Sequence, residues 1–336
     1  MNSFGRLFRM TIFGESHGTA VGLVLDGCPA GLSLKVEDFN TDIERRKGGI
    51  QKGTTPRQES DIPIFKSGVF NDWTTGAPIS ILFENNNTRS GDYEKLRATP
   101  RPGHADFVAH EKFGGFEDYR GAGHFSGRLT VALVAAGVIA KKLLRIVQTE
   151  IRAEITEIAG LKDLEAGIQK AIDAKDSVGG IVECRVQYLP VSLGEPFFDS
   201  VESLIAHAVF SIPAIRAIEF GTGFAAARMF GSEHNDAIAD KTGRTITNHA
   251  GGVVGGISNG NELVFRIAVK PTSSTPKEQE TYNRDTGIRE IFSVKGRHDL
   301  CIALRVPVVL EAVTALVLAD LLLLEQKIPR IVKTQK

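Results

Sequence analysis

The sequence predicts an α+β fold in which helices are sandwiched between sheets. Runs with the alternation and β-branched content of strands occur along most of the chain, while helical runs are fewer and longer. Two helical runs, 128–148 and 308–327, are apolar on nearly every face, as expected of helices covered on all sides. No linker, charge block or repeat divides the 336 residues, so we expect a single domain over 1–336.

The individual elements follow from periodicity and from turn residues at their ends. The strand-like runs lie at 7–13, 20–27, 78–84, 181–189, 217–220, 262–269 and 301–308. The helix-like runs lie at 36–47, 128–148, 161–175, 199–210 and 308–327. The most apolar stretch, 306–324, contains Pro307, Glu311 and Asp320, which predicts a buried core helix rather than a membrane span.

The segment from about 47 to 127 is rich in Gly, Pro, Arg and Asn and shows little periodicity. Loops of this length in a compact protein are usually functional or disordered. Arginines gather between residues 45 and 128, which leaves room for a local anion site. We therefore expect a loop-rich active-site segment over about 47–127.

Charge balance and cysteine pattern exclude several classes of protein. The 40 basic and 40 acidic side chains give a formal net charge of zero, which argues against non-specific nucleic-acid binding. Cys28, Cys184 and Cys301 lie far apart without a C-x-x-C pair, which indicates a reducing compartment. The N-terminus lacks signal-peptide features, so we expect a cytoplasmic protein that binds neither nucleic acid nor membrane.

The stretch GESHG at 14–18 matches the G-x-S-x-G nucleophile elbow of serine hydrolases. An elbow needs a helix after the serine, whereas residues 19–27 are β-branched and glycine-rich and predict a second strand. We therefore expect a hairpin connection that carries Glu15, Ser16 and His17. A serine hydrolase that uses Ser16 is kept as the alternative enzyme.

Two glycine-rich stretches imitate nucleotide-binding loops. GTGFAA at 221–226 follows a strand but lacks the helix of a dinucleotide-binding βαβ unit. GGVVGGISNG at 251–260 lacks the end of a P-loop and predicts either a tight strand connection or a backbone that approaches a phosphate or flat ring. The histidines form no H-E-x-x-H and no His/Cys pair, so no metal site is expected.

Polar residues framed by glycine occur at four separated places. RPGHADF at 101–107 presents Arg101 and His104 on a turn that its prolines keep non-helical. His17 lies on the turn at 14–18. Basic residues precede a long helix in DYRGAGHFSGRLT at 118–130, and a further polar cluster is GRHDLC at 296–301. We expect these clusters to form one site assembled from loops.

Together these stretches resemble the chorismate synthase family. The resemblance is carried by GESHG, RPGHADF, DYRGAG with SGR at 118–128, GGISNG at 255–260, KPTSS at 270–274, GRHDLC, DIERRKGG at 42–49 and SGVFNDWTTGAPI at 67–79. They follow the family's order from about residue 5 to residue 325. The resemblance implies a β-α-β sandwich, with long apolar helices layered between antiparallel sheets, assembled as a homotetramer.

The family converts 5-enolpyruvylshikimate 3-phosphate to chorismate and phosphate, the last step of the shikimate pathway to the aromatic amino acids. This lyase reaction is an anti-1,4-elimination that needs reduced FMN, although substrate and product share one oxidation state. The cofactor does the difficult chemistry and the protein positions it. Because the motifs fill the chain, we expect a monofunctional enzyme fed by an external flavin reductase, with NADPH used only indirectly through that reductase.

The resemblance also implies catalytic roles. His17 is expected beside the leaving phosphate, as its proton donor or electrostatic partner. His104 is expected near the N1 side of the flavin, where it would support the anionic reduced ring. Asp299 resembles the family's acidic residue near N5, with Ser16 and Ser126 as hydroxyls of a proton relay.

Binding roles carry over from the family in the same way. The basic residues that match substrate-binding positions are Arg46, Lys52, Arg101, Arg128 and Arg297. The residues that match flavin-binding positions are His124, Phe125, Ser126, Pro213, Ala214, Gly255, Lys270, Pro271, Thr272, Ser273, Ser274 and Arg297.

The sequence departs from the family's pattern in three places. GHFSGR stands where the family has G-R-S-S-A-R, so His124 and Phe125 replace an Arg and a Ser. Lys52 replaces an Arg, which keeps the charge but not the bidentate geometry, and Leu300 replaces a Pro. A non-enzymatic relative that binds flavin and has lost activity through the GHFSGR change is the second alternative.

Overall fold

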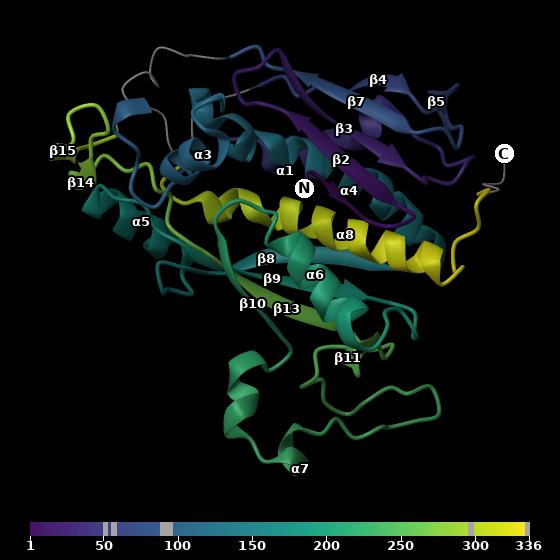
Figure 1. Ribbon diagram of the computed structural model, residues 1–336. Coiled ribbons are helices and arrows are strands. Elements are labelled where there is room, and N and C mark those ends of the chain that lie inside the picture. The colour runs from purple at the N-terminus through teal and green to yellow at the C-terminus, as the bar shows by residue number, and fades with distance from the viewer. Residues whose placement is uncertain (50–52, 55–58, 88–96, 295–298, 333–336) are drawn as a thin grey trace.

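Two antiparallel sheets enclose a layer of helices (Figure 1). The computed structural model describes residues 1–49, 53–54, 59–87, 97–294 and 299–332. The N-terminal sheet has the order β1-β2-β3-β7-β4, and the second sheet has the order β10-β13-β9-β8. The helices α1, α4 and α8 lie between them, so the predicted α+β sandwich is confirmed.

The N-terminal sheet is built around the hairpin that the sequence predicts at GESHG. Its strands are β1 (Ser3–Phe4), β2 (Arg9–Gly14), β3 (Ala20–Asp26), β7 (Ile79–Glu84) and β4 (Ile64–Ser67). Gly14, the last residue of β2, pairs with Val21 of β3, and residues 15–19 form the connecting turn. Along β7 buried and more exposed residues alternate, which gives the sheet one face toward the helices.

The second sheet covers the other side of the helix layer. Its strands are β8 (Glu150–Ile158), β9 (Gly180–Gln187), β10 (Ile215–Phe220) and β13 (Leu263–Val269). The sequence prediction missed β8, although EIRAEITEI alternates with the period of a strand. Its other three strands lie where the sequence predicts them, with shifts of a few residues at their ends.

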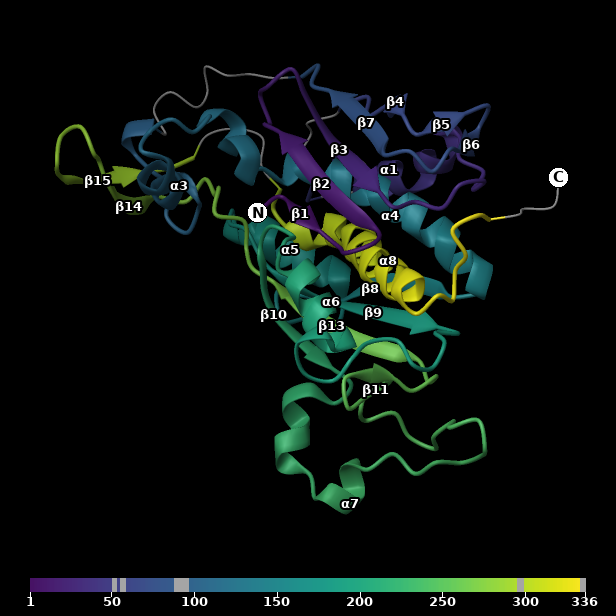
Figure 2. The same cartoon turned by 45° about the vertical axis from the view of Figure 1, so that its right-hand side comes forward.

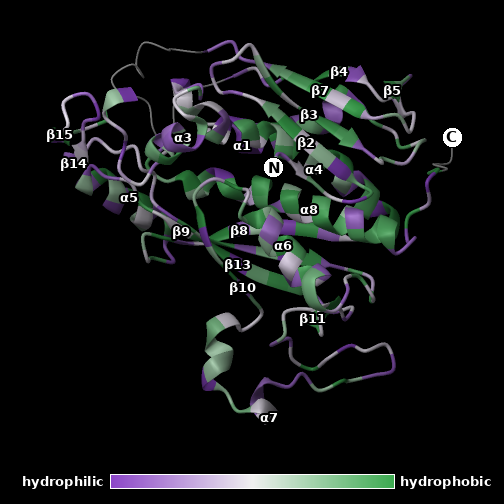
Figure 3. Cartoon of the chain, in the orientation of Figure 1, coloured by the Kyte–Doolittle hydropathy of each residue, from purple (hydrophilic) through white to green (hydrophobic). Residues whose placement is uncertain are grey.

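The helix layer contains the two most apolar helices of the chain, α4 (Thr130–Leu144) and α8 (Val306–Leu324), which pack along each other. Both appear green in the hydropathy view (Figure 3), with buried side chains on nearly every face. By length and composition Ile302–Leu324 could cross a membrane. However, 94% of the 18-residue apolar window within this segment is buried inside the protein. The prediction of a core helix is confirmed.

The strand predicted at 301–308 is wrong. Residues Ile302–Arg305 form the 3-10 helix η8, and α8 begins directly after it at Val306. The alternation of CIALRVPV imitates a strand over a short window. Pro307 fits the first turn of a helix because an N–H at that position has no partner within the helix.

The close packing of α4 on α8 at Gly137 leads to a prediction about stability. A Cβ on Gly137 would lie 2.3 Å from Ala312 Cβ and 2.5 Å from Ala312 Cα. Gly137→Ala is therefore expected to lower the free energy of unfolding by about 1–3 kcal/mol, because the helices must separate. At an exposed helix position the same change stabilises by about 1 kcal/mol.

Urea unfolding of the two proteins measures this effect. The control is Gly231→Ala in α7 (Gly231–His234), where an added Cβ meets nothing within 4 Å. If Gly137→Ala proved as stable as the parent protein, the close packing of α4 on α8 would be contradicted.

Shorter elements surround the sandwich. They include the 3-10 helix η1 (Val36–Phe39) leading into α1 (Asn40–Arg46), β5 (Val69–Phe70), β6 (Trp73–Thr74), α3 (Asp106–Phe113), α5 (Leu164–Ala174), α6 (Val201–Val209), β14 (Gln279–Tyr282) and β15 (Arg289–Phe292). The segment 47–127 thus holds β4 to β7 and α3 between its loops, which is more regular structure than its sequence predicts.

The segment from 221 to 262 forms an arm that projects from the second sheet (Figure 2). It contains η7 (Gly223–Arg228), α7, and the hairpin of β11 (Val253–Val254) and β12 (Ile257–Ser258). GTGFAA therefore enters a 3-10 helix beside an antiparallel strand, not a βαβ unit, and GGVVGGISNG is a tight strand connection.

Candidate functional site

A cavity of about 830 Å³ opens beside the helix layer and collects most of the residues that the sequence singles out. It lies between the N-terminal strands, the segments 101–105 and 121–130, the α6–β10 connection, the 270–274 loop and α8. The predicted site residues that line it are Arg101, His104, His124, Phe125, Ser126, Pro213, Ala214, Lys270, Pro271, Thr272, Ser273 and Ser274. Four segments far apart in the sequence therefore meet at one cavity.

The lining combines apolar walls with a small number of polar groups. Ile12, Leu133, Val313 and Leu316 come from β2, α4 and α8 and form part of the apolar surface. Among the residues that the structure describes, the buried hydroxyl of Thr272 has no hydrogen-bond partner. A cavity of this kind suits a ligand with a flat apolar body and polar edges.

The N-terminal segment is held at the cavity by a carboxylate in the core helix α8. Asp320 accepts hydrogen bonds from the backbone N–H groups of Arg6, Leu7 and Phe8 at 2.8–2.9 Å. This contact fixes the chain just before β2 and keeps the neighbouring residues 1–4 on the cavity wall. A buried acidic residue in an apolar helix is thereby satisfied by backbone donors.

The RPGHADF and KPTSS segments are joined by hydrogen bonds. Lys270 Nζ donates to Gly103 O at 2.8 Å and to Ser273 Oγ at 2.7 Å, and Ser273 Oγ donates to Gly103 O at 2.7 Å. Arg101 Nη1 donates to Ser274 Oγ at 2.9 Å. Burial, and then the charge of Arg216, lowers the pKa of Lys270.

His104 lies on the turn at the edge of a helix, two residues before α3 begins. Its Nδ1 is 2.6 Å from an oxygen of Asp106, and the same carboxylate accepts two hydrogen bonds from the Arg101 guanidinium at 2.7 and 2.8 Å. Burial would raise the pKa of Asp106, but the hydrogen bonds from Arg101 and His104 outweigh it and hold that pKa well below its usual range.

The GESHG turn packs against the 118–130 segment. Ser16 N donates to Gly123 O at 3.1 Å, and His124 Nδ1 donates to Gly14 O at 2.8 Å. Gly121 has φ +58°, and a Cβ there would lie 2.4 Å from His17 Cδ2. Ser16 and His17 are both buried and lie beside the cavity wall rather than on it.

A buried ionic cluster of Arg46, Asp61 and Arg128 adjoins the cavity. Asp61 accepts a hydrogen bond from Arg46 Nη2 at 2.5 Å and a second from Arg128 Nη1. Arg128 also donates from Nε to Asn85 Oδ1 at 2.9 Å and from Nη2 to Glu84 O at 3.2 Å. All three guanidinium nitrogens of Arg128 therefore already donate to the protein.

The charges of this cluster compensate one another. Burial would raise the pKa of Asp61, but the charges of Arg46 and Arg128 outweigh it and lower that pKa. Burial lowers the pKa of Arg46 to about 10, so this side chain stays charged at neutral pH. Arg46 Nε is buried and has no hydrogen-bond partner among the residues that the structure describes. This leaves one N–H donor of Arg46 for a ligand.

Thr130 connects the cluster to the cavity. Arg46 Nη1 donates to Thr130 Oγ1 at 3.4 Å, and Thr130 itself lines the cavity. On the other side, Arg305 Nε donates to Arg46 O at 2.8 Å while its Nη1 donates to Asp299 Oδ2 at 3.3 Å. Arg305 thus joins Asp299 to the cluster.

Gly255, a predicted flavin-binding residue, is not among the residues that line this cavity. It lies in the β11–β12 hairpin of the arm. Lys52 and Arg297 lie outside the described residues. Their roles stay predictions.

Sequence reasoning missed Asp61, Asp106 and Arg305, which hold the predicted site residues in place. Asp106 had a visible signal, since a carboxylate two residues after a histidine on a fixed turn can reach its ring. Asp61 and Arg305 had none, because Arg128, which bonds Asp61, and Arg46, which bonds Arg305, are far away in the sequence.

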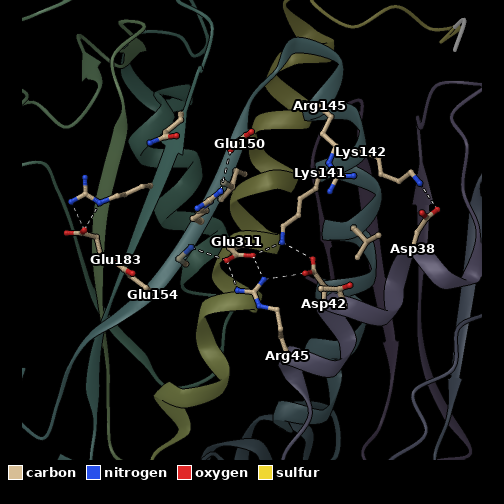
Figure 4. Close-up of a pocket in the computed structure, with 17 residues that line it drawn as sticks. Asp38, Asp42, Arg45, Lys141, Lys142, Arg145, Glu150, Glu154, Glu183 and Glu311 are labelled. Atoms are coloured by element: carbon tan, nitrogen blue, oxygen red, sulfur yellow. Dashed lines mark hydrogen bonds and ion pairs between the residues drawn. The ribbon is translucent and has the colours of Figure 1, made fainter. Parts of the chain in front are cut away.

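A second cleft of about 600 Å³ is lined mainly by charged side chains (Figure 4). Glu311 accepts two hydrogen bonds from Arg45 at 2.8 Å and one from Lys141 at 2.6 Å, and Lys141 also donates to Asp42 at 2.8 Å. Burial would raise the pKa of Glu311, but Arg45 and Lys141 lower it. None of the predicted site residues lines this cleft, and its network joins α1 to α4 and α8.

The cavity, the two histidines on glycine turns and the adjoining arginines define an enzyme that acts on a small molecule. Among the described residues, no group of three His, Cys, Asp or Glu side chains could hold a metal ion. The hydrolase alternative fails because Ser16 lies buried in a hairpin between two strands, without the helix of a nucleophile elbow.

Comparison with known proteins identifies the family. The sequence model of chorismate synthase matches residues 8–323. The chorismate synthase of Chitinophaga pinensis is 72% identical over 99% of this chain and all of that protein, and those of Dehalococcoides mccartyi and Thermococcus gammatolerans are 46% and 44% identical over at least 95% of both chains. A crystal structure of a chorismate synthase aligns with a TM-score of 0.72 at 25% identity, covering 96% of this chain and 93% of that one. The chain belongs to the chorismate synthase family and is an enzyme of that lyase class.

Proposed function

We propose that this chain converts 5-enolpyruvylshikimate 3-phosphate to chorismate and phosphate by anti-1,4-elimination, with reduced FMN as cofactor. The observation that carries the proposal is the junction at Thr130, where the cavity meets the Arg46–Asp61–Arg128 cluster. The substrate has a phosphate and two carboxylates, so it requires cations beside the cofactor. This junction offers them next to an apolar cavity of sufficient size.

The lining of the cavity fits a flavin. Its volume, about 830 Å³, lies within the usual range for ligand pockets. The apolar walls suit the ring system, while Lys270 and the unpartnered hydroxyl of Thr272 suit its polar groups. When bound, reduced FMN supplies the electron density and accepts the hydrogen that no ordinary side-chain base could remove.

The residues of the chain bind and orient the reactants in this proposal. Arg46 keeps its charge at neutral pH and faces the substrate phosphate or a carboxylate with its remaining Nε donor. His17, whose ring packs closely against Gly121, donates a proton to the leaving phosphate. Asp299, joined to Arg305, takes part in moving the other proton, with Ser16 and Ser126 as relay hydroxyls.

An anaerobic assay tests the function directly. The purified protein is mixed with 5-enolpyruvylshikimate 3-phosphate and with FMN that is either oxidised or reduced by dithionite, and chorismate and phosphate are followed together. Equal amounts of both products, formed only with reduced flavin, are expected. Turnover driven by NADPH alone, without a reductase, would contradict the monofunctional part of the proposal.

His104→Ala is expected to lower turnover at least tenfold while the protein stays folded, because the ring lines the cavity at the predicted flavin site. The same assay gives turnover, and thermal unfolding reports the fold. His110→Ala is the matched control, since His110 lies on α3 outside the cavity lining. Near-normal turnover of the His104 variant would remove this residue from the mechanism.

The same assay also decides on the inactive relative. The His124 ring forms hydrogen bonds with Gly14 O at 2.8 Å and with Asn2 Oδ1 at 3.1 Å. The histidine that replaces the family's arginine therefore has hydrogen-bond partners of its own within the protein. Tight binding of reduced FMN without turnover, and turnover restored by His124→Arg, would favour a flavin-binding protein over an enzyme.

The remaining parts of the proposal concern organisation. We keep a single domain over 1–336, an external flavin reductase and a cytoplasmic location, which the three unpaired buried cysteines fit. A homotetramer is supported by the arm, whose Phe224, Phe230, Ile238 and Ile246 are each more than 70% exposed. Light scattering after size-exclusion chromatography tests the tetramer.

A further inference from the structure

The side-chain amide of Asn85 links two parts of the site that are far apart in the sequence. Asn85 directly follows β7, and its Nδ2 donates to Glu15 O at 3.0 Å and to Gly18 O at 2.8 Å. Its Oδ1 accepts a hydrogen bond from Arg128 Nε at 2.9 Å. The amide therefore joins the GESHG turn to the buried ionic cluster.

The chemistry of these partners fixes the orientation of the amide. A backbone carbonyl only accepts hydrogen bonds, and an arginine N–H only donates them. The NH₂ group of Asn85 must therefore face the two carbonyls of the turn, and its oxygen must face Arg128. The flipped amide would place acceptor against acceptor at one end and donor against donor at the other.

The two carbonyls that Asn85 binds lie on either side of His17 in the sequence. Glu15 O also accepts a hydrogen bond from Gly18 N at 3.1 Å, which closes the turn around His17. The hydrogen bonds from the turn to the 118–130 segment come from the part of the turn before His17. Asn85 thus holds the far side of the turn as well as the near side.

We propose that Asn85 is a positioning residue, which sets the place of the His17 ring relative to the guanidinium group of Arg128. Its catalytic meaning rests on the proposed function, in which His17 and the ionic cluster serve one anionic substrate. A displacement near 1 Å at a reacting group can cost about hundredfold in rate. Asn85 is not among the residues that line the cavity, so its loss should affect kcat more than substrate binding.

Asn85→Ala and Asn85→Asp separate the two ends of the amide. Alanine removes all three side-chain hydrogen bonds. Aspartate keeps an oxygen for Arg128 Nε but turns its second oxygen toward the two carbonyls of the turn, where acceptors repel. If the turn depends on the amide donors, aspartate fails as alanine does. The aspartate variant also keeps the test available if the alanine variant does not fold.

Hydrogen–deuterium exchange read by mass spectrometry measures the turn without substrate or cofactor. The peptide that covers residues 14–19 is expected to exchange about tenfold faster or more in both variants, because the closed turn opens more often. In the anaerobic assay kcat is expected to fall about tenfold or more, with KM for the substrate changed less than about threefold.

Asn86→Ala and Asn86→Asp are the matched controls. Asn86 is exposed and bonds Glu59 Oε2 at 3.0 Å through its backbone N–H, which both changes leave in place. They repeat the changes of size and charge one residue further along the chain. Exchange of the 14–19 peptide and turnover are expected to stay as in the parent protein.

The outcomes are distinct. Unchanged exchange of the 14–19 peptide in Asn85→Ala would overturn the proposal, and so would faster exchange with normal turnover. Parent-like exchange and turnover in Asn85→Asp would also overturn it, since the contact with Arg128 would then be enough. Faster exchange in both variants, with no lyase activity in the parent protein, would support the link between Asn85 and the turn and count against the proposed function instead.

Discussion

Asp61→Asn is expected to lower the free energy of unfolding by about 3–5 kcal/mol, the largest effect on stability that we predict. The carboxylate is fully buried and accepts hydrogen bonds from two guanidinium groups that are themselves almost fully buried. Removing its charge leaves Arg46 and Arg128 facing each other in a poorly solvated place. The same repulsion should disturb the Arg46 contact to Thr130 and with it the cavity wall.

The effect has a defined pH dependence. The pKa of Asp61 is lowered in the folded protein, so its contribution to stability is present above the unfolded pKa, which is about 3.9, and is lost as the pH falls through the lower folded value. The parent protein should therefore lose stability in strong acid more steeply than Asp61→Asn does. Urea unfolding at neutral pH and at several acidic values measures both quantities.

Asp72→Asn is the matched control. Asp72 also has a positive φ, +64° against +51° for Asp61, so the two changes cost the same in backbone terms. Its side chain is 61% exposed and lies 3.7 Å from Lys35, an ion pair expected to contribute less than about 1 kcal/mol. Equal effects of the two variants would show that the buried cluster adds nothing specific.

Gly121→Ala is expected to lower turnover about hundredfold, since displacements near 1 Å at a reacting group can cost that much. The new Cβ would lie 2.4 Å from His17 Cδ2, 2.6 Å from Nε2 and 2.9 Å from Ser16 Oγ, so the imidazole ring has to move. The loss should appear in kcat, measured in the anaerobic assay, with thermal unfolding as the check on the fold.

Gly160→Ala is the control that separates the steric contact of the new Cβ with His17 from the strain of placing alanine at a positive φ. Gly160 has φ +81°, so alanine there is strained as well, but its Cβ would meet nothing within 4 Å. We expect a modest loss of stability and unchanged turnover in this control. If Gly121→Ala kept more than a third of normal turnover, His17 would not need its present position for catalysis.

The layers of the fold could be predicted because each depends on local pattern. GESHG followed by β-branched residues predicts the β2–β3 hairpin, and the all-round apolar runs predict α4 and α8 as covered helices. The error at 301–308 has a physical cause. An apolar run of only eight residues fits the period of a strand as well as that of a helix, so its pattern does not distinguish a strand from the first turns of a buried helix.

The site could be predicted only in part, for the same reason. His17, His104 and Arg101 are visible in the sequence because glycine and proline frame them on turns. The residues that hold them, such as Asp61 at the centre of the arginine cluster and Arg305 between Asp299 and Arg46, are chosen by tertiary contact. No local pattern distinguishes those side chains from ordinary surface charges.

The packing of α4 against α8 also makes the cavity part of the hydrophobic core. Leu133, Val313 and Leu316 line the cavity and come from the same two helices that pack closely at Gly137 and Ala312. A ligand in the cavity replaces solvent on these side chains only in the folded chain, so its binding free energy adds to the free energy of folding. If the proposed flavin binds there, the supply of that flavin sets part of the stability of the chain, which then resists unfolding more strongly when the flavin is plentiful.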